Sequence, residues 1–262
     1  ASVYCMYEDN SGLMWIGGSN GLNIYDQNKN PFRHYNQISN NKNSLPNDVV
    51  FTFVEDDDGL IWIGTNGGGL CSFDPVHERF QHYTHNPSIS NSISGDKVIS
   101  SYKDNNGDLW FGTYLTGLNL FEKKKQQFRR FYIDPVKNES ANLNWFRILY
   151  EDSRGHFWMG VGQTLFLFDK NTCQFNQSIQ NSPIPINSPV ASIVEDQQEN
   201  VWFGTQKGLW LYKLNENKFE QFEKLGSSDV RIVFLDRKGR VWAGTNGSGL
   251  ALVEYTANSV TF

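Results

Sequence analysis

A short motif, tryptophan followed two residues later by glycine, occurs six times at nearly regular intervals and constrains the fold more than any other feature. Successive tryptophans are separated by 47, 48, 48, 44 and 40 residues, at Trp15, Trp62, Trp110, Trp158, Trp202 and Trp242. Repeats of about 20–50 residues indicate an architecture in which neighbouring units share a core. Six copies of one unit account for nearly the whole chain.

Four further positions recur at nearly fixed distances around each tryptophan. An aspartate stands six residues before it, at Asp9, Asp56, Asp104, Asp152, Asp196 and Asp236. An apolar residue stands six residues before each aspartate, at Val3, Val50, Val98, Phe146, Val190 and Val230. A leucine follows each glycine, at Leu22, Leu70, Leu118, Leu165, Leu209 and Leu250. Ten residues after these leucines come Phe32, Phe80, Phe128, Phe175, Phe219 and, in the sixth copy, Val260.

Within one copy, four short apolar segments alternate with turn signals. In the second copy they are VVFTFVE, LIWIGT, LCSF and RFQHYT, a spacing typical of consecutive antiparallel strands. The second strand is apolar on both faces, with Leu60 and Trp62 on one side and Ile61 and Ile63 on the other. It must therefore be covered on both faces, as in small sheets stacked side by side. The sequence predicts an all-β fold, a β-propeller of four-stranded antiparallel blades.

The repeats also predict the domain organisation. We expect a single β-propeller domain over residues 1–262, with repeats at approximately 1–47, 48–95, 96–143, 144–187, 188–227 and 228–262. Six repeats are visible, and two arrangements stay open: a six-bladed propeller, or part of a seven-bladed ring.

The repeat also resembles a known family. Its pattern V-x5-D-x2-G-x-x-W-x-G-T-x-x-G-G-L-x-x-[FY]-[DE], with connections such as NSLPNDV, is similar to the two-component regulator propeller repeat over about residues 3–262. The resemblance implies the extracytoplasmic sensor part of hybrid two-component systems, mainly of Bacteroides-type gut bacteria, and a propeller of typically seven blades. Three positions depart from the pattern: Glu199 replaces a turn glycine, Thr164 replaces the glycine before Leu165, and Lys213 replaces an acidic residue.

Composition excludes several classes of function. Lys and Arg total 23 against 28 Asp and Glu, so no net positive field attracts nucleic acid or an anionic membrane. The three cysteines, Cys5, Cys71 and Cys173, are too far apart for a Cys-x-x-Cys metal site and odd in number for a disulfide framework. No apolar run reaches the roughly 18–20 residues that span a bilayer. We therefore expect no nucleic-acid contact, and membrane contact only through segments outside this chain.

Three recurring motifs look chemical but are better explained by the fold. The aspartates precede glycine turns and can accept bonds from backbone N–H groups, whereas a calcium loop would need alternating ligands and a terminal glutamate. The glycine-rich segments Gly17–Gly18, Gly67–Gly69 and Gly247–Gly249 lack the lysine and helix of a phosphate-binding loop, and we expect second-to-third-strand turns there. The tryptophans, equally placed in every copy, are expected to pack between blades.

No catalytic constellation is recognisable. His34 and His82 occupy equivalent places in fourth strands, His156 lies in a first-to-second-strand turn, and His77 and His85 fall in other loops. No nucleophile stands with a nearby base, and no HExxH motif occurs. We therefore expect no enzyme activity, no catalytic residues, no metal and no cofactor.

Function is better sought where the six copies differ. The connections between repeats are long and dissimilar, and in a propeller they emerge at the same face as the second-to-third-strand turns. Amides, charges and exposed aromatics there suit hydroxyl-rich or uronic ligands. The predicted ligand-binding residues are Asn47, Asp48, Asn66, Asp96, Lys97, Tyr114, Asn144, Trp145, Arg147, Gln163, Lys207, Asp229, Arg231 and Asn246. Any one of them can equally serve only to solvate a loop.

These observations and the resemblance lead to one functional hypothesis. It is an extracytoplasmic, periplasmic ligand-binding sensor module that recognises polysaccharide-derived oligosaccharides and forms a homodimer in the full-length protein. Two alternatives stay open. One is a propeller lyase acting on a cyclic peptide or uronate polymer, which would need a histidine and a basic residue to meet at the ligand face. The other is a protein-interaction platform.

Overall fold

The computed structural model describes residues 2–26, 32–133, 144–179, 182–222, 225, 229–254 and 259–261. The chain divides into two compact units, Ala1–Phe146 and Arg147–Phe262, which we call unit 1 and unit 2 and describe separately. Almost all regular structure in the described residues is β-strand, and none of their helical segments is long and apolar enough to cross a bilayer.

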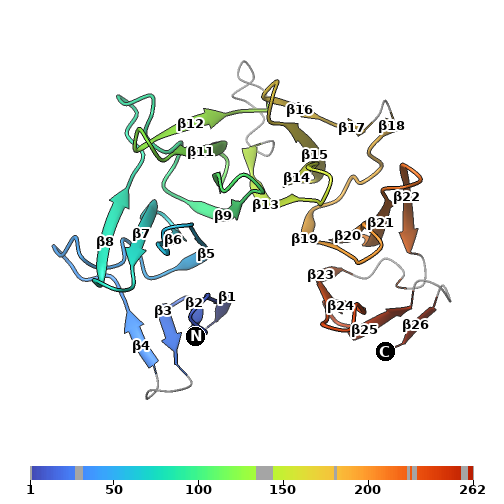
Figure 1. Ribbon diagram of the computed structural model, residues 1–262, viewed down its shortest axis with the longest axis horizontal. Coiled ribbons are helices and arrows are strands. Elements are labelled where there is room, and N and C mark those ends of the chain that lie inside the picture. The colour runs from blue at the N-terminus through green and yellow to red at the C-terminus, as the bar shows by residue number, and fades with distance from the viewer. Residues whose placement is uncertain are drawn as a thin grey trace. The chain divides into compact units, whose positions relative to one another are not determined.

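Unit 1 contains three four-stranded antiparallel sheets, blades 1 to 3 (Figure 1). Blade 1 comprises β1 (Val3–Glu8), β2 (Met14–Gly18), β3 (Gly21–Tyr25) and β4 (Phe32–Tyr35). Blade 2 comprises β5 (Val50–Glu55), β6 (Ile61–Thr65), β7 (Leu70–Asp74) and β8 (Arg79–Tyr83). Blade 3 comprises β9 (Val98–Lys103), β10 (Leu109–Thr113), β11 (Leu118–Glu122) and β12 (Gln127–Phe131).

Unit 2 contains three further four-stranded sheets, blades 4 to 6, and a small two-stranded sheet. Blade 4 comprises β13 (Phe146–Glu151), which begins at the last residue of unit 1, β14 (Phe157–Val161), β15 (Thr164–Asp169) and β16 (Gln174–Asn176). The small sheet pairs β17 (Ser178–Ile179) with β18 (Ser182–Pro183). Blade 5 comprises β19 (Val190–Glu195), β20 (Asn200–Thr205), β21 (Gly208–Lys213) and β22 (Lys218–Phe222). Blade 6 comprises β23 (Val230–Leu235), β24 (Val241–Thr245), β25 (Gly249–Glu254) and β26 (Ser259–Thr261).

The strands of every blade lie in chain order, each antiparallel to the next. The predicted all-β propeller fold is confirmed in its six four-stranded blades, and the four strands expected in the second copy match β5 to β8 to within a residue or two. Every residue of β6 is buried, as expected for a strand covered on both faces. The single-domain organisation stays a prediction.

The tryptophans of blades 1 and 2 in unit 1, and of blades 4 and 5 in unit 2, pack against the next blade, as predicted. Trp15 of blade 1 contacts Phe73 of blade 2 with ring centroids 5.7 Å apart. Trp62 of blade 2 contacts Phe121 of blade 3 at 4.5 Å. A large ring buried in this way packs one sheet against a second, separate sheet.

The recurring aspartate holds a turn and also binds the tryptophan, a link that the sequence analysis missed. Asp56 Oδ1 accepts hydrogen bonds from the backbone N–H groups of Asp58 (2.8 Å) and Leu60 (3.0 Å). Its Oδ2 accepts one from Trp62 Nε1 at 3.0 Å. The indole bond recurs in all six blades at 2.7–3.0 Å. Each carboxylate is thus filled by N–H donors, which supports the turn interpretation over calcium binding.

The predicted glycine turns are confirmed at two places and wrong at the third. Gly67 and Gly247 lie in second-to-third-strand turns with φ of 97° and 101°. Gly17 and Gly18 instead end strand β2, and the turn follows them. A Cβ on Gly17 would lie 2.7 Å from Cys5 Sγ and 2.8 Å from Val50 Cγ1. Glycine is needed there because blade 2 approaches too closely for a side chain.

Candidate functional site

The first strands of five blades each contain a β-bulge, which takes one residue out of the regular strand pairing and redirects its side chain. The pairing of first and second strands skips one residue in blades 1, 2, 3, 5 and 6. The skipped residues are Tyr4, Phe51, Ile99, Ala191 and Arg231. Bulges redirect side chains and are common beside functional sites. The identity of the skipped residue differs from blade to blade, whereas the residue before it is valine in all five blades.

In unit 1 the bulge residues Tyr4 and Phe51 belong to a continuous row of ring and cation contacts. Lys97 Nζ lies 4.3 Å from the ring centroid of Tyr114 and 5.8 Å from that of Phe51. Tyr114 meets Trp145 edge to face at 5.3 Å, and Phe51 lies 5.8 Å from Tyr4. We call Tyr4, Phe51, Lys97, Tyr114 and Trp145 the aromatic strip. All five are at least partly exposed, so this row of rings is open to solvent.

The sequence analysis predicted only part of this strip. Lys97, Tyr114 and Trp145 were expected at the ligand face, and the structure brings them together. Tyr4 and Phe51 were not predicted because they lie in strands, whereas the predicted residues lie in turns and in the connections between repeats or directly beside them. The sequence marks them only by variation. The residue that follows the recurring apolar residue of each first strand differs from repeat to repeat.

The predicted meeting of turns and connections at one end of each blade is visible in backbone bonds. Asn66 N, in the β6–β7 turn, donates to Val49 O at 2.9 Å, and Tyr114 N donates to Lys97 O at 2.9 Å. Asn66 also forms an isolated β-bridge with Lys97. Asn66, Lys97 and Tyr114 are therefore neighbours at the same end of blades 2 and 3.

Four other predicted residues of unit 1 are engaged within the chain. Asp48, Asp96 and Asn144 each accept a bond through Oδ1 from the backbone N–H eleven residues earlier, at 2.5, 2.6 and 3.5 Å respectively. Asn47 Oδ1 accepts from Val49 N at 2.9 Å. The repeated bond closes each connection after a fourth strand. These side chains therefore shape the loops, and ligand contact by them stays a prediction.

Unit 2 carries a cluster of charges at the start of blade 6. Arg231 Nη2 lies 2.5 Å from Asp229 Oδ2, and Asn246 Nδ2 donates to the same oxygen at 3.3 Å. Asp229 Oδ1 is buried and has no hydrogen-bond partner among the described residues. Arg147 interacts electrostatically with both Arg231 and Asp229. Burial lowers the pKa of Arg147, the charge of Arg231 lowers it further, and the charge of Asp229 raises it. The cluster thus combines two guanidinium groups with one carboxylate.

The remaining two candidates lie outside this cluster. Gln163 is exposed in the β14–β15 turn. Lys207 is exposed in the β20–β21 turn, where its Nζ donates to Asn187 O at 3.4 Å. The described contacts join neither residue to Asp229 or Arg231.

The histidines are held by local bonds in their blades. His34 and His82 lie in fourth strands β4 and β8, as expected, and bond through Nε2 to Asn20 O (2.5 Å) and Ser44 O (2.7 Å). His156 Nδ1 lies 2.9 Å from Asp152 Oδ2 in the β13–β14 turn. Within the described parts of the chain, these three rings make no contact with the aromatic strip or the Asp229 cluster.

Comparison with known proteins agrees with this architecture. Residues 1–20, 44–67, 92–115 and 184–207 match the family described as two component regulator propeller. A search of the curated proteins finds no match.

Three solved structures illustrate the shared fold. The extracellular domain of a hybrid two-component system from B. thetaiotaomicron has a TM-score of 0.81 at 23% identity, over 99% of this chain and 34% of that one. A catalytically inactive virginiamycin B lyase from Staphylococcus aureus has a TM-score of 0.73 at 14% identity, over 99% and 83%. PorZ, a surface component of the type-IX secretion system of Porphyromonas gingivalis, has a TM-score of 0.69 at 16% identity, over 99% and 41%.

This chain spans about a third of the length of the hybrid two-component structure, so likeness to it concerns the propeller alone. The matched segments of the family each cover a first strand, the aspartate turn and a second strand, the parts that recur most closely in all six blades. Four segments of the chain therefore match two component regulator propeller repeats.

Proposed function

We propose that the chain is the ligand-binding propeller of an extracytoplasmic sensor and that it recognises polysaccharide-derived oligosaccharides. The observation that carries the proposal is the aromatic strip of unit 1. The family match and the likeness to an extracellular domain of a hybrid two-component system support the sensor role.

The aromatic strip suits a sugar because it offers both aromatic rings for stacking and polar groups for hydrogen bonding. Tyr114 and Trp145 present rings at the solvent-exposed end of the blades, and rings of this kind stack on the apolar faces of pyranose sugars. Lys97 Nζ lies 4.3 Å from the ring centroid of Tyr114 and 5.8 Å from that of Phe51, and its ammonium can donate to hydroxyls or to a carboxylate. Asn66, next to Lys97, offers an amide with two donors and one acceptor group.

The charged cluster of unit 2 favours an acidic sugar. Arg147 and Arg231 supply planar guanidinium groups, which pair well with carboxylate or sulfate. An oligosaccharide with uronic or sulfated residues offers such anionic groups, whereas a neutral one does not.

The proposal includes properties of the whole protein that lie beyond this chain. We infer a non-enzymatic module on the periplasmic side, joined by other segments to a membrane anchor and signalling domains, and a homodimer in the full-length protein. Histidines bonded to backbone carbonyls at the outer strands support binding over lyase chemistry, since a lyase would need one of them at the ligand face.

Isothermal calorimetry against neutral, uronic and sulfated oligosaccharides tests the proposal. We expect saturable heat with at least one acidic oligosaccharide and a loss of roughly two- to tenfold in affinity on Tyr114→Ala, because one stacked ring contributes roughly 0.5–1.5 kcal/mol. Tyr25→Ala, at the far end of strand β3 and 38% exposed, is the matched control and should bind normally. Absence of heat across the panel, or equal loss in both variants, would refute the proposal.

The same panel separates binding from turnover. Chromatography of each oligosaccharide after long incubation with the protein should show no new unsaturated or shortened product. A product that disappears on replacing one histidine would establish the lyase instead.

A further inference from the structure

Four asparagines of this chain are directly followed by glycine, the sequence in which asparagine loses its amide group most readily. They are Asn20, Asn66, Asn106 and Asn246. The reaction begins when the backbone nitrogen of the glycine attacks the side-chain Cγ of the asparagine. Glycine permits the attack because it has no Cβ to obstruct the approach and its backbone rotates easily. Which of the four pairs reacts therefore depends on how firmly the fold holds each glycine nitrogen.

Three of the four glycines are held by backbone pairing. Gly67 N donates to Asp96 O at 2.9 Å, and Gly107 N donates to Asp104 O at 2.9 Å. Gly21 is the first residue of strand β3 and is paired with strand β2, so the sheet fixes its backbone. Each of these contacts must open before the glycine nitrogen can move towards the asparagine side chain.

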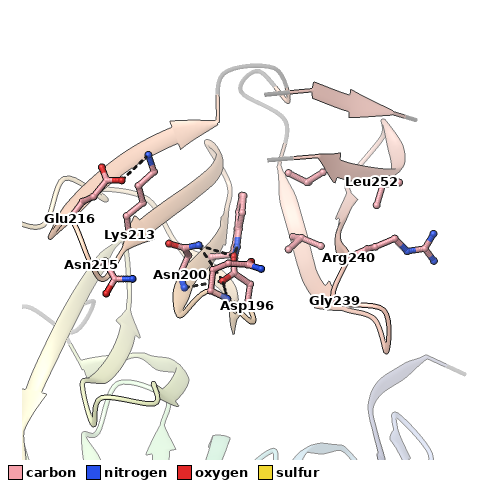
Figure 2. A pocket seen from close by; sticks show the side chains of 12 residues that line it. Asp196, Asn200, Lys213, Asn215, Glu216, Gly239, Arg240 and Leu252 are labelled. Atoms are coloured by element: carbon pink, nitrogen blue, oxygen red, sulfur yellow. Dashed lines mark hydrogen bonds and ion pairs between the residues drawn. The ribbon is translucent and has the colours of Figure 1, made fainter. Parts of the chain in front are cut away.

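Gly247, which follows Asn246, is the exception. It lies exposed in the β24–β25 turn with φ of 101°, and its N–H has no hydrogen-bond partner among the residues that the structure describes. A Cβ placed on it would meet nothing within 4 Å. The β23–β24 turn of the same blade, where Figure 2 shows Gly239, is different because Gly239 N donates to Asp236 O at 2.9 Å. Gly247 N can therefore turn towards Asn246 without giving up a hydrogen bond.

The side chain of Asn246 is also accessible. The residue is exposed, and its Nδ2 donates to Asp229 Oδ2 at 3.3 Å, which is long for a hydrogen bond. The backbone before it is fixed, because Asn246 N donates to Asp229 O at 2.8 Å. The asparagine is thus held beside Asp229, whereas no bond holds the N–H of the glycine after it.

We propose that Asn246 is a site of spontaneous deamidation, and that the reaction adds a negative charge to the Asp229 cluster. Gly247 N forms a bond to Cγ of Asn246, and the bond between Cγ and Nδ2 breaks. The amide nitrogen leaves as ammonia, with the proton that Gly247 N gives up, and a succinimide ring remains. Water then opens the ring at either carbonyl and yields aspartate or isoaspartate.

The product changes the electrostatics of the cluster. A carboxylate at position 246 replaces an amide that donates to Asp229 Oδ2, so an attractive contact becomes a repulsion between like charges. Arg231 Nη2 lies 2.5 Å from the same oxygen, and the new carboxylate competes with an anionic ligand for this guanidinium. The consequence, which rests on the function proposed above, is that deamidation weakens recognition of an acidic sugar.

Peptide mass spectrometry of the aged 262-residue chain tests the proposal on the unmodified protein. The four pairs fall in four different tryptic peptides, and deamidation adds about 1 Da to the peptide concerned. In the folded protein at mildly alkaline pH, Asn246 should convert faster than Asn20, Asn66 and Asn106. The expected difference is roughly two- to tenfold for each hydrogen bond that must open. Equal rates at all four positions, or slower conversion of Asn246, would overturn the proposal.

Unfolding provides the matched control. In concentrated urea the four pairs lose their different surroundings, so their rates should become similar. A preference for Asn246 that persists in urea would show that local sequence causes it and would refute the structural argument. Asn246→Gln should abolish the mass gain at this position, because glutamine cyclises far more slowly than asparagine.

The effect on the ligand site is tested with Asn246→Asp, which carries the charge of the product. We expect this variant to bind an acidic oligosaccharide several-fold more weakly than Asn106→Asp, which adds the same charge in the β9–β10 turn. Equal binding by the two variants would refute the effect on the site. Because the mass measurements need no ligand, their outcome is independent of the proposed function.

Discussion

Replacing Asp56 by alanine should destabilise the protein by about 2–4 kcal/mol. The carboxylate accepts bonds from Asp58 N, Leu60 N and Trp62 Nε1 at 2.8–3.0 Å, and Trp62 is 2% exposed. An orphaned buried donor costs about 1–3 kcal/mol, and the indole N–H cannot reach water. The two turn N–H groups are only partly buried, so they add a smaller loss.

Thermal unfolding followed by circular dichroism measures the effect. For a chain of this size, the expected loss corresponds to a fall in Tm of roughly 4–16 °C. Asp236→Ala is the matched control: it removes the same set of acceptors, but the side chain of Asp236 is 17% exposed against 3% for Asp56. Water can replace the lost acceptor there, so the fall in Tm should be smaller.

A double-mutant cycle isolates the indole bond. Trp62→Phe removes the N–H donor, so the loss from Asp56→Ala should be smaller in the Trp62→Phe background than in the wild type. Additive losses, or an equal fall in Tm for Asp56→Ala and Asp236→Ala, would refute the argument from buried donors.

Three further predictions follow from local geometry. The urea midpoint should fall as pH drops below about 4, and a flat profile would contradict this. The Trp242 indole bond lowers the pKa of Asp236, and although burial raises the pKa of Asp9, its hydrogen bonds outweigh burial and lower it. The stability that these carboxylates contribute is therefore present above the unfolded pKa of about 3.9 and is lost as pH falls through the lower folded pKa. Glu199→Gly should be more stable than Glu199→Ala by about 1 kcal/mol in denaturant titrations, because residue 199 has φ of 61° and both variants lose the Arg154 pair; equal stability would exclude backbone strain. Gly64→Ala should cost about 1–3 kcal/mol, since its Cβ would lie 2.7–2.9 Å from Thr52 and Val98; an unchanged Tm would show that blade 3 can yield.

The repeat made most of the fold predictable. Positions that recur in all six copies predict four strands per copy, the aspartate turn and a buried tryptophan. They recur because every blade must pack against its neighbours in the same way. The error at Gly17 and Gly18 arose because a glycine required by a neighbouring sheet has the same letter as a glycine required by a turn. Only the distance to Cys5 and Val50 distinguishes the two.

The candidate sites were less predictable, for a physical reason. Comparison of the copies led to Lys97, Tyr114 and Trp145, but not to their contacts or to Tyr4 and Phe51. Bulges displace the side chains of Tyr4 and Phe51, and the sequence marks these positions only by their variation between copies. It also did not reveal that Asp96 and Asn144 close their own loops through a bond to a residue eleven positions earlier.

The sequence by itself determined the blade, because its hydrophobic spacing and turn residues are local and repeat. Tertiary structure decided what the exceptions mean. Phe51 is an unremarkable strand residue in the sequence, yet its ring lies 5.8 Å from that of Tyr4 in blade 1 and 5.8 Å from Lys97 Nζ before blade 3. Such an effect depends on which side chains from two blades share one space, and chain order does not specify that distance.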